Sequence, residues 1–269
     1  MPIFASFWRL SPLIVVLVSF PLVRISLIDV LDQSVLLAAP YLFACVLLGF
    51  ASMFNRSRFI APILIASFTY YFIQERLQTS LAQNEAMALF AGVNVLFCLQ
   101  LLIASLMPEK GMFNRVGGLF TSLIVLCACL LWFFGESENW QVFIAGIESQ
   151  QQSFSSEHYW FTNALIYSHL ATLLVLVLAA AVRRHVADYA LLLTWLAGVL
   201  VFVDFSSENL SSVCFSMLFL GLFILYQQSN YQVTYKDALT GISGRRALED
   251  YLSTLGRHYS IAMLDVDHF

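Results

Sequence analysis

Charged residues are scarce in this chain of 269 residues. Lysine and arginine together number 13 and aspartate and glutamate 17, so that 11% of the residues are charged and 60% are hydrophobic. Soluble domains are typically about 25% charged and about 45–50% apolar. The composition therefore excludes an ordinary soluble domain and predicts a polytopic membrane protein. The formal net charge of −4 carries no nucleic-acid signal, and no nucleic-acid partner is expected.

Cysteine spacings that are typical of metal or redox sites are also missing. All five cysteines lie inside apolar runs, where a thiol behaves as a small hydrophobic group. Cys127 and Cys129 form C-x-C rather than C-x-x-C, and no histidine or second cysteine pair stands near them in the sequence. This pattern argues against a zinc site and against a redox site.

Long apolar runs fill residues 1–226. A membrane core of about 30 Å requires roughly 20 apolar residues in a helix. The predicted fold of this part is an all-α polytopic membrane bundle of about eight transmembrane helices, with a sensory or anchoring role. The eight predicted spans are Phe7–Val23, Ser34–Met53, Phe59–Gln74, Met87–Met107, Leu119–Phe134, Trp160–Val182, Tyr189–Phe205 and Ser212–Tyr226.

Positively charged residues are unevenly divided between the two sides that eight spans define. Seven lie on the side of both chain termini, and only Arg24 and Arg76 lie on the other. Because lysine and arginine mark the cytoplasmic face, both termini are predicted to be cytoplasmic. The seven residues are Arg9, Arg56, Arg58, Lys110, Arg115, Arg183 and Arg184.

Polar residues at membrane depth are candidates for function, because burying them is costly. His169 lies in the sixth predicted span and Asn94 in the fourth. Two interpretations of His169 stay open: a neutral imidazole hydrogen-bonded between helices, or a sensor of protons or of a ligand. No predicted span carries two ionisable groups at its centre, and the two halves show no internal repeat. Both absences argue against a proton-coupled transporter.

A polar segment, residues 227–236, follows the last predicted span without proline or glycine. We predict a linker helix that continues this span, with Tyr231 and Tyr235 on one face as an i, i+4 pair. A rigid helix there would pass a rotation or shift from the membrane to the residues that follow. An ordinary polar linker is the alternative interpretation.

The stretch Asp237–Phe269 has the pattern of a turn, a helix and a buried strand. Aspartate, threonine and glycine crowd its start, and an apolar stripe at i, i+3, i+4 and i+7 predicts a helix from about Arg245. Residues 259–264 form a short apolar run that predicts a strand, with Asp265 at its carboxyl end and Asp267 after it. Carboxylates in such a place suit a hard divalent cation, and a structural cap is the alternative interpretation.

Two motifs in this stretch, D-A-L-T-G-I-S-G-R-R and L-D-V-D-H-F, resemble the opening of GGDEF domains, the diguanylate cyclases. The resemblance covers Asp237–Phe269, which is 33 of the 269 residues. It implies that the membrane bundle is followed by the first helix and first strand of a truncated α/β domain with the palm fold of nucleotidyl cyclases. The domains expected are a membrane module at 1–226, a linker helix at 227–236 and an N-terminal GGDEF fragment at 237–269.

The resemblance also implies roles for individual residues. Asp265 and the carbonyl of Val266 correspond to contacts with Mg²⁺ or Mn²⁺, and the amides of His268 and Phe269 correspond to groups that cradle the GTP phosphates. Gly244 stands where the family usually has asparagine, a change that is expected to loosen the opening turn. The opening motif, which positions the linker, corresponds to Asp237, Leu239, Thr240, Arg245 and Arg246.

The family joins two GTP molecules into cyclic di-GMP and releases two pyrophosphates, with one GTP held by each of two facing heads. The resemblance therefore implies a homodimeric enzyme in a bacterial-type inner (cytoplasmic) membrane, with the lipid bilayer and GTP as partners and control by the membrane module.

The G-G-[DE]-E-F turn is absent from residues 237–269. This stretch is therefore expected to be catalytically incomplete and inactive by itself, as a fragment of a longer protein or a truncated product. Two other functions stay open. One is a transporter-like or channel-like membrane bundle, and the other is a membrane receptor or scaffold with a degenerate head.

Overall fold

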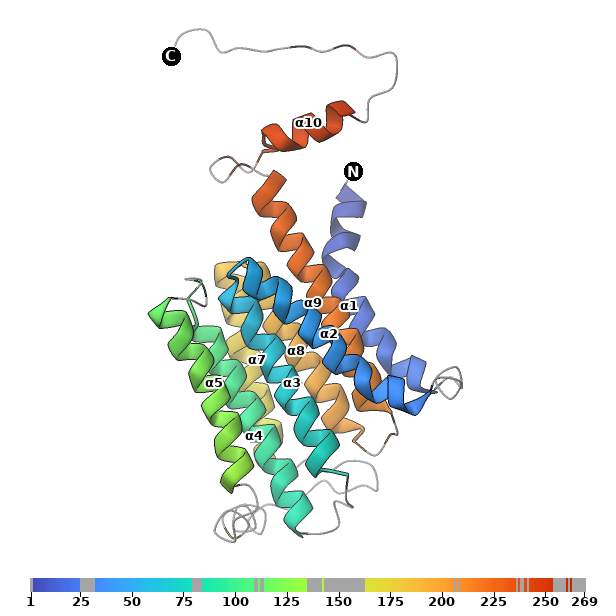
Figure 1. Ribbon diagram of the computed structural model, residues 1–269, viewed down its shortest axis with the longest axis vertical. Helices are drawn as coiled ribbons and strands as arrows, with labels where there is room; N and C mark the ends of the chain where they lie inside the picture. Colours follow the sequence, from blue (N-terminus) through green and yellow to red (C-terminus); the bar gives the residue numbers. More distant parts are fainter. Residues whose placement is uncertain are drawn as a thin grey trace. The chain divides into compact units, whose positions relative to one another are not determined.

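The structure is a computed structural model, and its described residues are helical apart from short connections. The chain divides into two units, Met1–Tyr226 and Gln227–Phe269. The described residues are 2–24, 32–78, 84–108, 111, 114–134, 142, 163–205, 207, 209–235, 237, 240, 242–253, 260 and 262. The helices, labelled as in Figure 1, are α1 (Pro2–Arg24), α2 (Gln33–Met53), α3 (Ser57–Arg76), α4 (Asn84–Leu106), α5 (Arg115–Phe134), α7 (Asn163–Arg183), α8 (Val186–Val203), α9 (Leu210–Tyr235) and α10 (Arg245–Ser253).

Helix α3 lies at the centre of the first unit, where it contacts α2, α4, α5 and α8 (Figure 1). Most of its 20 residues are buried, from small side chains such as Ala66 to large ones such as Tyr70. Helix α4 contacts α5, α7 and α8 as well as α3, and α1 contacts α8. Few side chains of α2 and α7 are buried, so these helices form part of the outside of the bundle.

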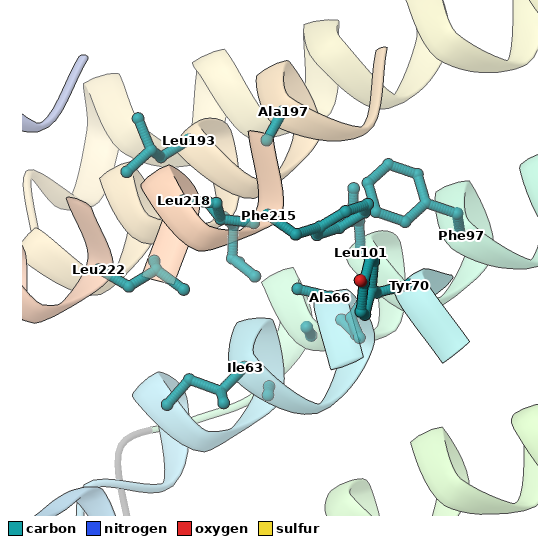
Figure 2. Packing of buried hydrophobic residues seen from close by; sticks show 14 of the residues in the cluster. Ile63, Ala66, Tyr70, Phe97, Leu101, Leu193, Ala197, Phe215, Leu218 and Leu222 are labelled. Atoms are coloured by element: carbon teal, nitrogen blue, oxygen red, sulfur yellow. The ribbon is translucent and has the colours of Figure 1, made fainter. Parts of the chain in front are cut away.

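Most of the aliphatic and aromatic side chains in the core of the bundle come from α3, α4, α8 and α9. Figure 2 shows Phe215 of α9 near Tyr70 of α3, and the centroids of these two rings are 5.5 Å apart. Phe97 of α4 and Phe202 of α8 meet edge to face, with ring centroids 5.6 Å apart. Aromatic rings favour this arrangement, because the positive edge of one ring faces the negative face of the other.

The outer helices expose apolar side chains while polar ones are buried inside. Leu42 of α2 is 64% exposed and Leu174 of α7 is 61% exposed, whereas Asn94 and Thr194 are fully buried. Apolar surface of this extent is an aggregation liability in water, but lipid chains cover it in a membrane. The distribution of side chains is therefore that of a membrane protein.

Each of the eight predicted spans overlaps a helix of the bundle, and the number of helices that cross a membrane stays a prediction. Among the described residues, five helices are long and apolar enough to cross a membrane, by length and composition. Within the described side chains, Ser11–Val23 of α1 and Arg115–Leu130 of α5 are apolar stretches of 10–17 residues, and α3 is less apolar because it contains Arg58, Gln74 and Glu75. The five helices are Gln33–Met53, Leu89–Leu106, Asn163–Arg183, Val186–Val203 and Leu210–Tyr235.

The structure also overturns the predicted α/β fold of the second unit. Of the predicted strand at 259–264, Ser260 and Ala262 are described, and both are exposed in irregular backbone. No strand or sheet occurs within the described part of the chain. A single strand leaves its backbone N–H and C=O groups without partners, and an independent sheet needs about three strands. The predicted helix is present as α10, with Leu248 and Tyr251 of its apolar stripe exposed.

Candidate functional site

A buried polar cluster joins α4 and α7 inside the bundle. It centres on His169 of α7, which is 5% exposed. The Nε2 atom of His169 lies 3.1 Å from Oδ1 of Asn94, and its Nδ1 atom lies 3.5 Å from Sγ of Cys98. Asn94 and Cys98 are one helical turn apart on α4, and side chains at this spacing share a helix face. The cluster therefore joins one face of α4 to one side chain of α7.

The hydrogen bonds of this cluster determine which ring nitrogen of His169 carries the proton. Asn94 donates from Nδ2 to the carbonyl oxygen of Phe90 at 2.8 Å, so its Oδ1 atom is the acceptor that faces the ring. Nε2 of His169 therefore donates, and Nδ1 accepts from the thiol of Cys98. A neutral imidazole satisfies both contacts. The aromatic rings around it belong to Phe97, Trp195 and Phe202.

A hydrogen bond from His169 to another helix is one of the two interpretations drawn from the sequence, and the sensor hypothesis stays a prediction. Sequence reasoning misses Cys98, because it treats every cysteine in an apolar run as a small hydrophobic group. The i, i+4 spacing of Asn94 and Cys98 is the signal that points to a shared polar face. Chemically, the cluster can hold a proton at Nε2 and presents a thiol beside an imidazole.

A second buried polar contact lies at the end of the bundle near Tyr226. Arg58 in the first turn of α3 pairs with Asp188 in the first turn of α8, and their side chains are 5% and 1% exposed. Arg183 at the end of α7 places Nη1 3.8 Å from Oδ1 of Asp188 and donates from Nη1 to the carbonyl oxygen of Ser105. These contacts connect α3, α4, α7 and α8 at one level of the bundle.

The position of Arg58 corrects the sequence analysis, which counted it among loop charges on the cytoplasmic side. Arg58 belongs to α3 and is buried. Its partner Asp188 is 130 residues away in the sequence, so no local pattern identifies the pair. Lys110, another residue in that count, lies outside the described residues.

Tyr226 holds α9 against α2 and α3 at the same end of the bundle. Its hydroxyl donates to the carbonyl oxygen of Phe50 at 3.1 Å. Its ring meets Phe59 edge to face, with ring centroids 5.5 Å apart. Phe59 follows Arg58 in the sequence, so the buried ion pair and this aromatic contact hold the same turn of α3. Helix α9 continues beyond Tyr226 to Tyr235.

The first residues of the opening motif form a closed turn after α9. The carboxylate of Asp237 accepts hydrogen bonds from the backbone N–H and the hydroxyl of Thr240, each at 2.8 Å. The N–H of Asp237 donates to the carbonyl of Ile242 at 2.9 Å, and the N–H of Gly244 donates to the carbonyl of Tyr235 at 2.8 Å. Aspartate and threonine favour such turns because their side chains bond to nearby backbone groups.

The expectation that Gly244 loosens this turn stays a prediction, although the position has room for a larger side chain. A Cβ atom at this position would make only ordinary contacts, the nearest at 3.7 Å from the carbonyl oxygen of Tyr235. Arg245 and Arg246 of the opening motif are exposed on α10. Arg245 donates from Nε to Glu249 at 2.8 Å, and an exposed pair of this kind contributes little to stability.

The last turn of α9 contacts α10 through Tyr235. A hydrogen bond to the carboxylate of Asp250, together with the negative charge of that group, raises the pKa of Tyr235 above its ordinary value of 10.0. The ring of Tyr235 also stacks on Tyr231, with ring centroids 4.7 Å apart. Within the described part of the second unit, the turn and these side chains therefore connect α9 to α10.

The predicted metal and substrate residues lie outside the described residues, and so does Leu239 of the opening motif. Their roles stay predictions. Elsewhere in the part of the chain that the structure describes, no group of three or more His, Cys, Asp or Glu side chains is placed to hold a metal ion. The residues concerned are Asp265, Val266, His268 and Phe269.

Two features of the described chain are thus candidates for a functional site. One is the thiol–imidazole–amide cluster inside the bundle, and the other is the closed turn that follows α9. Comparison of the chain with protein-family models, with curated proteins and with solved structures finds no match.

Proposed function

We propose that this chain supplies the membrane module and the opening of the catalytic part of a membrane-anchored diguanylate cyclase. One observation carries the proposal: the motifs D-A-L-T-G-I-S-G-R-R and L-D-V-D-H-F follow the apolar helix α9 in the order and at the separation found in GGDEF domains. The closed turn between Asp237 and Thr240 supports it.

In this proposal the carboxylate of Asp265 and the carbonyl of Val266 bind a divalent cation, Mg²⁺ or Mn²⁺. The amides of His268 and Phe269 contact the phosphates of GTP. A divalent cation in such a site neutralises phosphate charge and polarises the phosphoryl oxygen. Each catalytic head holds one GTP, so two copies of the chain act together as a homodimer in the membrane.

The proposal puts the Tyr226 end of the bundle on the cytoplasmic side of a bacterial-type inner membrane, where GTP is available. Positive charge gathers at this end, and positive residues mark the cytoplasmic face. The N-terminal end of α1 lies at the same end of the bundle (Figure 1), so both termini are cytoplasmic in this proposal. The arginines at this end are Arg56, Arg115, Arg183 and Arg184, and those at the opposite end are Arg24 and Arg76.

The test measures formation of cyclic di-GMP from GTP in membranes that contain the complete gene product, with any residues encoded after Phe269. We expect product in the presence of Mg²⁺ and its loss in an Asp265→Asn variant. Glu249→Gln is the control, because Glu249 is an exposed carboxylate on α10 and should leave product formation unchanged. Membranes that form no cyclic di-GMP would contradict the proposal, and so would unchanged product formation by Asp265→Asn.

A further inference from the structure

A hollow lies between α2, α3 and α5 on the side of the bundle. Its volume is about 420 Å³, within the range of roughly 300–1,000 Å³ that is usual for small-molecule sites. Cys129 is exposed and Tyr71 is 36% exposed, so the hollow is reachable from the surface that faces lipid. Its lining residues are Tyr41, Ser67, Phe68, Tyr71, Phe72, Ala128 and Cys129.

The chemistry of the lining excludes a charged ligand and favours a flat ring. The lining contains no aspartate, glutamate, lysine, arginine or histidine, and four of its seven residues are aromatic. The hydroxyl of Ser67 is occupied within its own helix, since it donates to the carbonyl oxygen of Ile63 at 2.7 Å. Aromatic side chains that stack on a planar ring gain free energy beyond that of apolar contact alone. A flexible acyl chain does not obtain this additional free energy.

We propose that this hollow is a binding site for an uncharged, membrane-dissolved molecule that carries a flat aromatic ring. Such a molecule reaches the site from the bilayer, because the hollow opens on the lipid-facing surface. It enters between the aromatic side chains of α2 and α3 and rests against Ala128 and Cys129 of α5. Binding at this site does not depend on the diguanylate cyclase activity proposed above.

The hollow is connected to α9 by direct contacts. The ring of Tyr41, a wall of the hollow, packs against Tyr70 with ring centroids 5.0 Å apart. The hydroxyl of Tyr70 donates to the carbonyl oxygen of Leu37 at 2.9 Å and lies 2.9 Å from Oγ of Ser212 near the start of α9. Gln74 on the next turn of α3 donates to Ser211 at 2.9 Å. A ring that displaces Tyr41 therefore acts on α9, the helix that leaves the bundle at Tyr226.

The test uses trifluoromethyl-phenyldiazirine, a lipid-soluble aromatic probe that forms a carbene on illumination and labels the residues it touches. The complete chain in liposomes is illuminated with the probe, and labelled peptides are quantified by mass spectrometry. We expect excess labelling of the segment 67–72 of α3 relative to lipid-facing Leu174 of α7, which reports simple partition into the bilayer. Anthracene should abolish this excess, whereas hexadecane at the same membrane concentration should leave it.

Two tryptophan variants provide the matched comparison. Cys129→Trp fills the hollow and should abolish the excess labelling, while Leu178→Trp places the same side chain at an exposed position of α7, outside the hollow, and should preserve it. Labelling of the segment 67–72 no stronger than that of Leu174 would overturn the site. If hexadecane displaces the probe as effectively as anthracene does, the preference for an aromatic ring is refuted and the hollow is assigned to an acyl chain.

A second measurement separates this site from the proposed catalytic function. If the complete gene product makes cyclic di-GMP, anthracene should change the rate in the wild type and in Leu178→Trp but not in Cys129→Trp. Labelling that behaves as expected without any cyclic di-GMP would retain the binding site and refute only the enzyme. Product formation with no excess labelling would retain the enzyme and refute only the binding site.

Discussion

At the scale of single residues, the bundle depends on polar side chains that meet across helices. The pair of Arg58 and Asp188 is the clearest case, because both side chains are buried. Breaking a buried ion pair by removing one partner leaves an uncompensated charge, whereas replacing both partners with apolar residues is often neutral or stabilising.

We therefore expect Asp188→Leu to lower the free energy of unfolding by about 3–5 kcal/mol. The double variant Arg58→Met/Asp188→Leu should recover most of this loss, since no buried charge is left without its partner. Denaturant unfolding in detergent micelles measures both values. A double variant that is no more stable than Asp188→Leu would show that the buried charge is not the cause.

His169 and Asn94 should be coupled energetically through the 3.1 Å hydrogen bond between α7 and α4. Hydrogen bonds between membrane helices contribute about 0.6 kcal/mol on average and at most about 1.7 kcal/mol. A double-mutant cycle with His169→Leu and Asn94→Leu should give a coupling energy in this range. A cycle of His169→Leu with Thr194→Val is the control, because Thr194 donates to Ala190 of its own helix. Equal coupling energies in both cycles would contradict the assignment of the coupling to the hydrogen bond between His169 and Asn94.

Tyr235 leads to a prediction about pH. Its raised pKa means that the folded second unit holds this proton more tightly than the unfolded chain does. The contact with Asp250 is therefore fully present below the ordinary pKa of 10.0 and is lost as the pH rises through the raised value. The tyrosinate absorbance of the wild type minus that of Tyr235→Phe should titrate above pH 10.0. In an Asp250→Asn background this difference should shift back toward pH 10.0, and an unchanged midpoint would refute the contact.

At the scale of helices, close packing between α4 and α8 depends on one glycine. A Cβ atom at Gly198 of α8 would lie 2.4 Å from the tip of the Phe97 ring. That ring cannot move freely, since it is 1% exposed and packs against His169 and Phe202. Gly198 therefore sets how closely the two helices approach.

Gly198→Ala should destabilise the bundle by about 1–3 kcal/mol, the usual cost of overpacking a core. Gly49→Ala is the matched control, because Gly49 of α2 has nothing within 4 Å of the added Cβ atom. Alanine there should be neutral or stabilise the helix by up to about 1 kcal/mol. Thermal unfolding of both variants in the same detergent checks the difference. Equal stability of the two variants would contradict the packing argument.

At the scale of the whole molecule, α9 connects the bundle to the second unit. It runs without interruption from Leu210 to Tyr235, and it is held by Tyr70 and Gln74 at its start and by Phe50 and Phe59 at Tyr226. Under the proposed function, a change in the bundle reaches the catalytic head as a rotation or shift of this helix.

Insertions after Gln228 test this coupling in the complete gene product. One inserted alanine rotates the rest of the helix by about 100°, whereas seven restore its phase after about two turns. Control of cyclic di-GMP formation by the bundle should therefore be lost with one alanine and recovered with seven. Control that declines steadily with insertion length would show that the segment after Tyr226 acts as a flexible tether.

The sequence by itself determined the features that depend on neighbouring residues. Long apolar runs predicted the helices that became α2, α7 and α9, because the length and composition of a run are local properties. Turn chemistry placed a turn at Asp237 and a helix start at Arg245 for the same reason. The predicted strand at 259–264 was wrong, because a strand also requires a partner that local pattern does not provide.

Only the tertiary structure decided which polar residues meet. Arg58 is a loop charge by sequence position, yet it pairs with Asp188 inside the bundle. Cys98 is one cysteine among five in apolar runs, yet its thiol faces His169. Which faces of two helices pack together depends on all the contacts of the bundle at once. A buried polar side chain is stable only where that packing brings it a partner from another helix.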